Sequence, residues 1–556
     1  MGTNRGGAQI FSCCLVGTGG LLVQCGELLA TRGHQVARVI SPDPRVERWA
    51  ARTGMPFVGA KTGGDCALAL TGVEPDYLFS IVNPWILPPE VLRRPRRLAI
   101  NYHDSPLPAY PGYHSTSWAL LAGETAHGIS WHVMAERVDS GDLLRCSRIP
   151  IAPGETAFSL NMKCYEAALT AFGALVDAME ADRLERRPQP PGRRCFHRRA
   201  ERPAVGGVLS WQRSAEELDR LVRALDFGGT ANTLLCPKLA AGDRFVLVHR
   251  LEILPSSSGT APGTITGLTP DALQVTTTTR DIALSELATI DGKPLAAGRV
   301  AAALRLRPGG KLPELAAATA ERLTRLSSEL APHEAHWLER LARLAPLALP
   351  PRSDCTPRGE AVTLPLRLPA ALAARPEWTE RREEAAALLA TAFGRALSRA
   401  FGRASFDIGF RCSETSRDTA GLEGFFAAYV PLRLDLAGSG EPGAAPRIRQ
   451  EIAAARRHRT YARDLTARHP LPWRDGAGDP PRLEVAIAAG PAPTPARGAG
   501  APAVVLVLGD GPDAGSAHLR CAAAPSPTEW ARQLGEQCER WLDEMAGAPR
   551  GAFVPV

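Results

Sequence analysis

Two apolar runs separated by a glycine turn and a helix open the chain and limit the kind of sheet that it can form. Residues 8–16 and 35–41 are apolar and strand-like, and residues 17–34 combine a glycine turn with helix-favouring residues. A strand–helix–strand order of this kind joins parallel strands through a right-handed crossover. The sequence therefore predicts an α/β domain with a parallel sheet at its N-terminal end.

The glycine turn after the first strand does not complete a dinucleotide-binding fingerprint. Gly17 and Gly19 match the first two glycines of G-x-G-x-x-G, but Leu22 stands where the third would fall. A tight strand-to-helix turn accounts for these glycines without a nucleotide. The pattern therefore argues against an NAD-linked oxidoreductase, which the α/β fold would otherwise allow.

A later strand ends in two polar side chains that share a face. Side chains two apart on a strand point the same way, about 6.5–7 Å apart, so Asn101 and His103 lie together, and Pro106 and Pro108 stiffen the exit. An amide can donate to a developing oxyanion, and an imidazole can move protons. This pair predicts a site that acts on a polarised carbonyl group. Alternatively, the two side chains cap the loop that follows the strand.

A carboxylate in a Ser-Gly turn is a third polar group for this site. Asp139 is placed to orient His103 or raise its basicity, whereas Asp142 either belongs to the site or braces the turn. His132 alternates within a strand, and we expect it to take a core role. No His, Cys, Asp or Glu cluster has the spacing of metal ligands, so no metal is predicted.

The segments NYHDSPLP (101–108) and HGISWHVMAERVDSGDLL (127–144) resemble the signature of the formyltransferase family that uses 10-formyltetrahydrofolate. That resemblance implies a Rossmann-like catalytic domain in which Asn101, His103 and Asp139 catalyse formyl transfer to an amine without a metal. The sequence departs from the family at Pro106, where the family has leucine.

The resemblance also implies two groups of binding residues. The segment NPWILPPEVL (83–92) is similar to the family's folate loop. The residues expected to bind 10-formyltetrahydrofolate are Asn83, Trp85, Ile86, Leu87, Pro88, Val138 and Asp142. Those expected to bind the acceptor are Ser105, Leu107, Tyr113 and His114.

Changes in composition divide the chain into three predicted domains and a linker. Residues 1–185 are expected to form the catalytic domain, and residues 186–204, rich in arginine and proline, a solvated linker. Residues 205–307 begin with a capping box and continue in short strands, which predicts a small β-barrel-like domain that resembles the second domain of the family's tRNA and sugar enzymes. Residues 308–556 are expected to form a separate α/β domain, with one continuous helix over 447–468.

The last domain resembles the second lobe of condensation domains from nonribosomal peptide synthetases. It lacks the HHxxxDG motif of an active condensation enzyme, so the resemblance implies docking or scaffolding. The expected acceptor is thus a free or carrier-protein-tethered amine in natural-product biosynthesis, and a synthetase is a possible partner of this domain.

Charge and hydropathy exclude other partners. The net charge of +7 is small for 556 residues, and residues 109–117 contain no Lys or Arg, which argues against a tRNA substrate. No apolar run reaches 18 residues, and the twelve cysteines form no CxxC pair, so we expect a cytoplasmic protein that binds neither membrane nor nucleic acid. Two alternatives to the transferase remain: a formyltetrahydrofolate hydrolase, and a non-catalytic scaffold of a synthetase complex.

Overall fold

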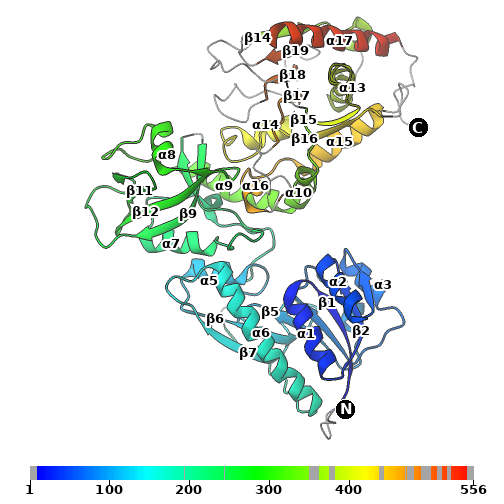
Figure 1. The fold of residues 1–556 in the computed structure, drawn as a ribbon, viewed down its shortest axis with the longest axis vertical. Coiled ribbons are helices and arrows are strands. Elements are labelled where there is room, and N and C mark those ends of the chain that lie inside the picture. Colours follow the sequence, from blue (N-terminus) through cyan, green and yellow to red (C-terminus); the bar gives the residue numbers. More distant parts are fainter. Residues whose placement is uncertain are drawn as a thin grey trace.

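The computed structural model describes residues 9–192, 194–242, 244–347, 349, 362–374, 382–437, 444–469, 471, 481–489, 502–509, 516–521 and 527–547. Figure 1 shows three sheet-based units that follow one another along the molecule, with the N-terminal unit at one end and the C-terminal unit at the other. Across these described ranges, no helix is long and apolar enough to cross a membrane.

The first unit is a seven-stranded sheet in the order β3-β2-β1-β4-β5-β6-β7, covered by helices. Its strands are β1 (Ser12–Gly17), β2 (Gln35–Ser41), β3 (Phe57–Gly59), β4 (Tyr77–Ile81), β5 (Leu98–His103), β6 (Ala126–Val133) and β7 (Leu143–Pro150). Its helices are α1 (Gly19–Thr31), α2 (Pro44–Thr53), α3 (Gly63–Ala69), α4 (Pro89–Leu92), α5 (Ser115–Ala122) and α6 (Ala157–Glu180). The strands from β3 to β5 run parallel, as predicted, and β6 and β7 extend the sheet antiparallel.

The glycine turn after β1 is explained by the close approach of two strands. Gly17 has φ +145°, and a Cβ atom there would lie 1.8 Å from the carbonyl oxygen of Ile81 on β4. The neighbouring Thr18 hydroxyl donates to the carbonyl of Val82 (2.8 Å). Glycine is therefore required for strand packing, which is the structural explanation that the sequence favoured.

The second unit is an antiparallel sheet in the order β10-β11-β12-β9-β8, with β13 paired to β12. Its strands are β8 (Lys238–Ala241), β9 (Arg244–Ile253), β10 (Ile265–Leu268), β11 (Ala272–Thr276), β12 (Asp281–Thr289) and β13 (Pro294–Leu295). The helical segments around it are η1 (Ala204–Gly207), α7 (Ala215–Ala224) and α8 (Ala297–Leu304). The predicted capping box of α7 is confirmed, since Ser214 and Glu217 each bond the other's backbone.

The third unit is a mixed six-stranded sheet in the order β14-β19-β18-β17-β15-β16. Its strands are β14 (Val362–Leu366), β15 (Ser405–Cys412), β16 (Val430–Asp435), β17 (Val485–Ala489), β18 (Val504–Leu508) and β19 (Ala517–Cys521). The helical segments are α9 (Ala317–Leu330), η2 (Ala331–His333), α10 (Glu334–Ala342), α11 (Ala370–Ala373), α13 (Arg382–Phe401), α14 (Ser413–Thr419), α15 (Ala444–His458), α16 (Leu465–Arg468) and α17 (Pro527–Gly547).

The prediction of one helix over 447–468 is wrong. α15 ends at His458, and Arg459 adopts a left-handed φ of 54° that no continuous α-helix contains. The chain then turns into the short helix α16. Charged residues that a continuous helix would have displayed on its surface are thereby turned into an interface with the second unit.

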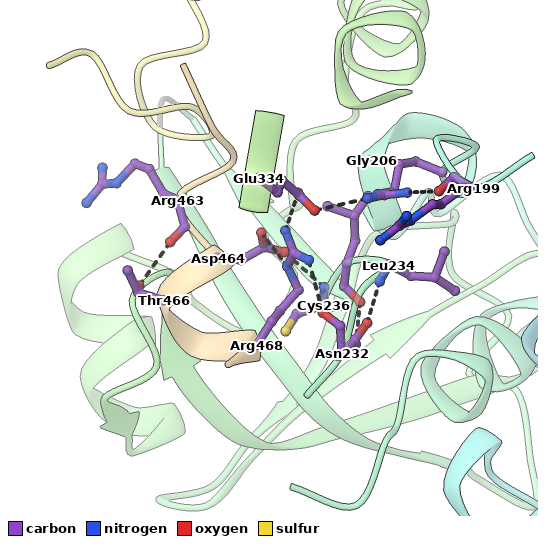
Figure 2. Close-up of polar contacts among 12 residues, drawn as sticks. Arg199, Gly206, Asn232, Leu234, Cys236, Glu334, Arg463, Asp464, Thr466 and Arg468 are labelled. Atoms are coloured by element: carbon purple, nitrogen blue, oxygen red, sulfur yellow. Dashed lines mark hydrogen bonds and ion pairs between the residues drawn. The ribbon is translucent and has the colours of Figure 1, made fainter. Parts of the chain in front are cut away.

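That interface contains a buried group of charged side chains. Lys238 Nζ on β8 lies 2.5 Å from Asp464 Oδ2, and both side chains are fully buried. Arg468 pairs with Asp464 (3.1 Å) and with Glu334 on α10 (2.6 Å), and Figure 2 shows Arg468 between these two carboxylates. Arg202 completes the group by pairing with Glu334 (2.9 Å). We call these residues the interface ion cluster: Arg202, Lys238, Glu334, Asp464 and Arg468.

Apolar side chains surround the interface ion cluster. The rings of Phe245 on β9 and Phe425 meet edge-on with centroids 5.3 Å apart. Lys238 Nζ also lies 4.8 Å from the centroid of the Phe425 ring. Leu326 on α9 and Leu422 belong to the same buried apolar cluster. The second and third units therefore share one buried apolar cluster at their interface, in addition to a core of their own.

Candidate active site

The end of β5 places two polar side chains beside two side chains of β6. Asn101 lies opposite His132 in the antiparallel ladder, and His103 lies opposite Ser130. Asn101 and His103 share a face because strand side chains alternate. The predicted pair is thus held on a rigid central strand where β5 leaves the sheet.

His132 orients the amide of Asn101. Its Nδ1 lies 2.9 Å from the carbonyl oxygen of Val133, which only a ring N–H can satisfy. The opposite ring nitrogen, Nε2, lies 3.2 Å from Asn101 Nδ2 and accepts one of the two amide hydrogens. The second amide hydrogen stays available as a donor. His132 is buried as expected, but its role extends from the core to the site.

His103 has one ring nitrogen fixed and the other facing carboxylates. Nε2 donates to the carbonyl oxygen of Tyr110 at 3.0 Å. Nδ1 lies 3.8 Å from Asp139 Oδ2 and 3.7 Å from Asp104 Oδ1. Nδ1 is therefore the ring nitrogen that faces the two carboxylates, and an imidazole nitrogen placed in this way can exchange a proton with a bound group.

Asp139 lies close to both histidines and is strained. Its φ is +50°, in the left-handed region, and its carboxylate accepts the backbone N–H of Gly112 (2.8 Å) and lies 3.5 Å from His132 Nε2. Burial raises the pKa of Asp139, but the charge on His103 and the hydrogen bond from the N–H of Gly112 outweigh burial and hold it well below its usual range. Asp139 is therefore a carboxylate at neutral pH.

The structure brings the three predicted residues together. Asn101 offers an N–H donor, His103 a proton-transfer group, and Asp139 a fixed negative charge behind the imidazole. A donor aimed at a carbonyl oxygen and a positioned base are the two requirements of acyl transfer through a tetrahedral intermediate. Asp104 is a further neighbour of His103 that the sequence analysis did not identify.

A segment predicted as a solvated linker also packs against the Asp139 loop. Residues 187–192 and 194–202, which we call the strap, follow α6, pair with Leu143 of β7 and lead to the second unit. Gln189 Nε2 donates to the carbonyl oxygens of Asp139 (3.0 Å) and Gly141 (2.9 Å). Arg194 donates to those of Asp139 (2.9 Å) and Val138 (2.7 Å). The predicted linker therefore also has polar side chains that find acceptors on a neighbouring loop, which its composition did not indicate.

The strap also contacts the loop after β5. The N–H of His197 donates to the carbonyl of Pro111 (3.1 Å), and the His197 carbonyl accepts from the N–H of Tyr113 (3.0 Å). Gly112 lies between these two positions with φ +98°, and a Cβ atom there would be 2.2 Å from the His197 carbonyl oxygen. Only glycine allows this approach.

The predicted folate loop exposes an apolar side chain next to the site. The Asn83 side chain bonds the backbone of Trp85 in both directions (3.1 Å each), which fixes the loop. Ile86 is 71% exposed, whereas Leu87 is buried. Pro88 is the N-cap of α4. An exposed isoleucine on a fixed loop suits the apolar face of a flat ring such as a pterin.

The two other residues predicted to bind the donor lie in the Asp139 loop. The Val138 carbonyl accepts a hydrogen bond from Arg194. Asp142 pairs with Arg186 (3.0 Å), and its carbonyl accepts from the N–H of Val133 (2.8 Å). Asp142 therefore braces the turn, which is one of the two roles that the sequence left open.

Two of the four predicted acceptor residues are placed away from solvent. Ser105 and Leu107 are buried, and the Ser105 hydroxyl donates to the carbonyl of Ala109 (2.7 Å). Ser130 donates to the Ser105 carbonyl (2.8 Å) and accepts from the Leu107 N–H (3.1 Å). These two residues brace the loop, which corrects the expectation that their side chains face the acceptor.

The other two predicted acceptor residues are half-buried beside the strap. The guanidinium of Arg199 lies over the Tyr113 ring, 5.9 Å from its centroid. His114 has a left-handed φ of 60° and lies 3.5 Å from Thr233 Oγ1. Burial, with the charges of Arg202 and Arg199, lowers the pKa of His114 to about 4. His114 is therefore neutral at physiological pH.

In the described part of the chain, no group of three or more His, Cys, Asp or Glu side chains is arranged to hold a metal ion.

Comparisons with known proteins match the first two units. A family model described as formyl transferase matches residues 65–176, and one described as formyl transferase, C-terminal domain, matches residues 206–305. A methionyl-tRNA formyltransferase from Acidithiobacillus ferrooxidans is 31% identical over 242 residues, which are 43% of this chain and 74% of the relative.

Two solved structures are also similar in part. WlaRD, described as a sugar 3N-formyl transferase and solved with dTDP and 5-N-formyl-THF, gives a TM-score of 0.42 at 14% identity, covering 50% of this chain and 98% of that one. HypX from Aquifex aeolicus, in complex with tetrahydrofolic acid, gives a TM-score of 0.39 at 16% identity, covering 53% of this chain and 47% of that one.

Proposed function

The chain belongs to the formyl transferase family, and from this premise we propose that it transfers a formyl group from 10-formyltetrahydrofolate to an amine acceptor. The observation that carries the proposal is the convergence of Asn101, His103 and Asp139 at the end of β5. A transferase of this kind needs an oxyanion donor and a proton-transfer group within reach of one carbonyl carbon, and these residues supply both.

The proposed reaction forms one C–N bond and breaks another. The acceptor nitrogen attacks the formyl carbon, and the free N–H of Asn101 donates to the carbonyl oxygen as it gains negative charge. His103 takes the proton that the amine loses and delivers it to the departing folate nitrogen. Asp139 stabilises the protonated ring during this transfer. No net proton is gained or lost.

The donor would lie against the loop from Asn83 to Pro88. Exposed Ile86 and half-buried Trp85 offer apolar surface to its flat ring. Val138, on the Asp139 loop, is the third contact that we assign to the donor, and Asp142 holds that loop through Arg186.

We propose an amino acid, free or tethered to a carrier protein, as the acceptor. The segment 109–117 has no Lys or Arg, but the strap places Arg199 over Tyr113. A guanidinium beside a loop that itself has no Lys or Arg suits a carboxylate or a single phosphate, whereas a polynucleotide needs many cationic contacts. Neutral His114 adds a hydrogen-bonding group without adding positive charge beside the acceptor amine.

The third unit is proposed as a docking domain for a synthetase or carrier protein in natural-product biosynthesis. The support is the resemblance of residues 308–556 to the second lobe of condensation domains, without their HHxxxDG motif. This role predicts a lower KM for a carrier-bound amino acid than for the same amino acid free in solution. Equal KM values for the two forms would contradict it.

The test of the proposed function is tetrahydrofolate release from 10-formyltetrahydrofolate, first without acceptor and then with a panel of amines. The panel contains hydroxylated ornithine or lysine, amino sugars, aminoacyl carrier proteins and methionyl-tRNA. Release that depends on an amino acid or its carrier-bound form supports the proposal. Equal tetrahydrofolate release without any amine would indicate a hydrolase. If the folded protein releases no tetrahydrofolate under any of these conditions, a scaffold is indicated.

Replacing Asn101 with alanine is expected to lower kcat by about 10²–10³-fold, the usual effect of removing one oxyanion donor. The KM for 10-formyltetrahydrofolate should change little, because the lost hydrogen bond strengthens only as charge develops. Steady-state kinetics at saturating acceptor measure both constants. A rise in KM at unchanged kcat would show that Asn101 only binds the donor.

A further inference from the structure

The strap connects the two loops that hold the Asp139 carboxylate. We propose that it is a positioning element for the reaction proposed above and that Arg194 is its principal positioning residue. The proposal depends on the assignment of Asp139 to that reaction. It goes beyond the predicted site, because the strap lay in a segment expected to be a solvated linker.

The first contact is with the backbone of Asp139 itself. One terminal nitrogen of Arg194 donates to the Asp139 carbonyl (2.9 Å), and the other donates to that of Val138 (2.7 Å). Gln189 adds bonds to the Asp139 and Gly141 carbonyls. A non-glycine residue with a positive φ persists only when its surroundings hold it, and these donors fix the backbone on both sides of the strained residue.

The second contact is with the group that bonds the carboxylate. Gly112 N–H donates to Asp139 Oδ2 (2.8 Å), and His197 pins the neighbouring residues Pro111 and Tyr113 by two backbone hydrogen bonds. The same strap therefore fixes both Asp139 and a donor to its side chain. The position of the Asp139 carboxylate relative to His103 Nδ1, 3.8 Å from Oδ2, depends on both of these contacts.

The two ends of the strap are anchored in different units. Arg187 exchanges backbone hydrogen bonds with Leu143 on β7 (2.7 and 2.9 Å). Arg202, at the other end, is buried and pairs with Glu334 of the interface ion cluster. Both described parts of the strap are therefore anchored, residues 187–192 on the first unit and residues 194–202 on the interface ion cluster.

The test compares Arg194→Ala and Arg194→Lys with the wild type, with Arg187→Ala as the matched control. The Arg187 side chain is 76% exposed and pairs only with nearby Glu185 in the described structure, so this control removes an arginine from the strap without touching the Asp139 loop. Each variant is first checked for an unchanged melting temperature.

Arg194→Ala is expected to lower kcat by up to about 10²-fold, the cost of a small misplacement of a catalytic group. KM for the donor should stay close to that of the wild type. The kcat of Arg194→Lys, which keeps one donor, should lie between that of Arg194→Ala and that of the wild type. The acidic limb of the kcat–pH profile should move to higher pH, because a displaced Asp139 moves away from His103 and from the Gly112 N–H, which keep its pKa low. The Arg187→Ala profile should match the wild type.

A titration that needs no turnover separates this proposal from the proposed function. The carboxyl signal of Asp139 in ¹³C-labelled protein, identified by its loss in Asp139→Asn, should titrate at higher pH in Arg194→Ala than in the wild type. An unshifted titration would overturn the proposal, as would a fall in kcat that is equal at every pH. If the wild type releases no tetrahydrofolate with any acceptor, the proposed function fails and the carboxyl titration still decides the role of the strap.

Discussion

Replacing His103 with alanine is expected to lower kcat by about 10²–10⁴-fold, the range of a general acid–base contribution. The two nearest rings differ from His103: His132 uses both ring nitrogens, on Val133 and Asn101, and His127 Nε2 lies against the carbonyl of Asp104 (2.7 Å). Single-turnover tetrahydrofolate release at saturating donor measures the loss directly. The variant should lower kcat far more than it changes KM, because the His103 ring transfers a proton in the transition state and does not bind the ground-state substrate.

A second histidine provides the matched control. His34 is buried and bonded to a carboxylate, Glu180 Oε1, at 3.0 Å, but it precedes β2, which is separated from β5 by β1 and β4. His34→Gln should leave kcat close to that of the wild type even if it lowers the melting temperature. Near-normal turnover in His103→Ala would remove His103 from the mechanism and leave Asn101 as the main catalytic group.

Replacing Asp464 with asparagine is expected to destabilise the protein by about 3–5 kcal/mol, the cost of leaving a buried charge without its partner. The change keeps the shape of the side chain but leaves Lys238, which is fully buried, and Arg468 without their shared carboxylate. Urea unfolding followed by tryptophan fluorescence measures the loss. Trp211 and Trp337, both buried, report on the second and third units.

Two further variants separate charge from packing. Arg532→Ala breaks an exposed pair with Glu529 on α17 and should leave stability unchanged. The double change Lys238→Met with Asp464→Leu should recover much of the loss, because an apolar pair requires no compensating charge. Equal stability of Asp464→Asn and the wild type would show that Lys238 finds another counter-ion.

The effect of Asp464 should also depend on pH. Burial raises the pKa of this carboxyl group, but Lys238 and Arg468 outweigh burial and lower it from 3.8 to about 2. A lowered folded-state pKa stabilises the protein above the unfolded value, and the stabilisation is lost as pH falls through the folded value. The difference in unfolding free energy between the wild type and Asp464→Asn should therefore become smaller as the pH falls.

The parts of the fold that follow local rules were predictable. The apolar runs around Gly17 indicated parallel strands, the Ser214–Glu217 pair marked a helix start, and the alternation of β5 placed Asn101 and His103 on one face. The start of α2 had a signal that was not used, since Asp43 caps the helix and Pro44 follows it.

The contacts that were missed have no local pattern. Arg194 and Gln189 bind carbonyl oxygens, which every residue has, so nothing in the sequence of the Asp139 loop marks it as their partner. The role of His132 depends on register between β5 and β6. The break after His458 leads into contacts between residues far apart in sequence, such as Lys238 and Asp464, which are 226 positions apart and which no local pattern marks as partners.

The interface ion cluster limits how this protein can be recombined with its relatives. A chimaera that joins residues 1–307 to a different C-terminal partner would inherit Arg202 and Lys238 without Glu334, Asp464 and Arg468, and so would bury two cations with no anion beside them. Grafting the third unit onto another enzyme would leave Glu334, Asp464 and Arg468 without Arg202 and Lys238. The two surfaces that meet at this interface are therefore complementary in charge. A domain exchange that keeps the protein stable must transfer the second and third units together, so that the interface ion cluster stays complete.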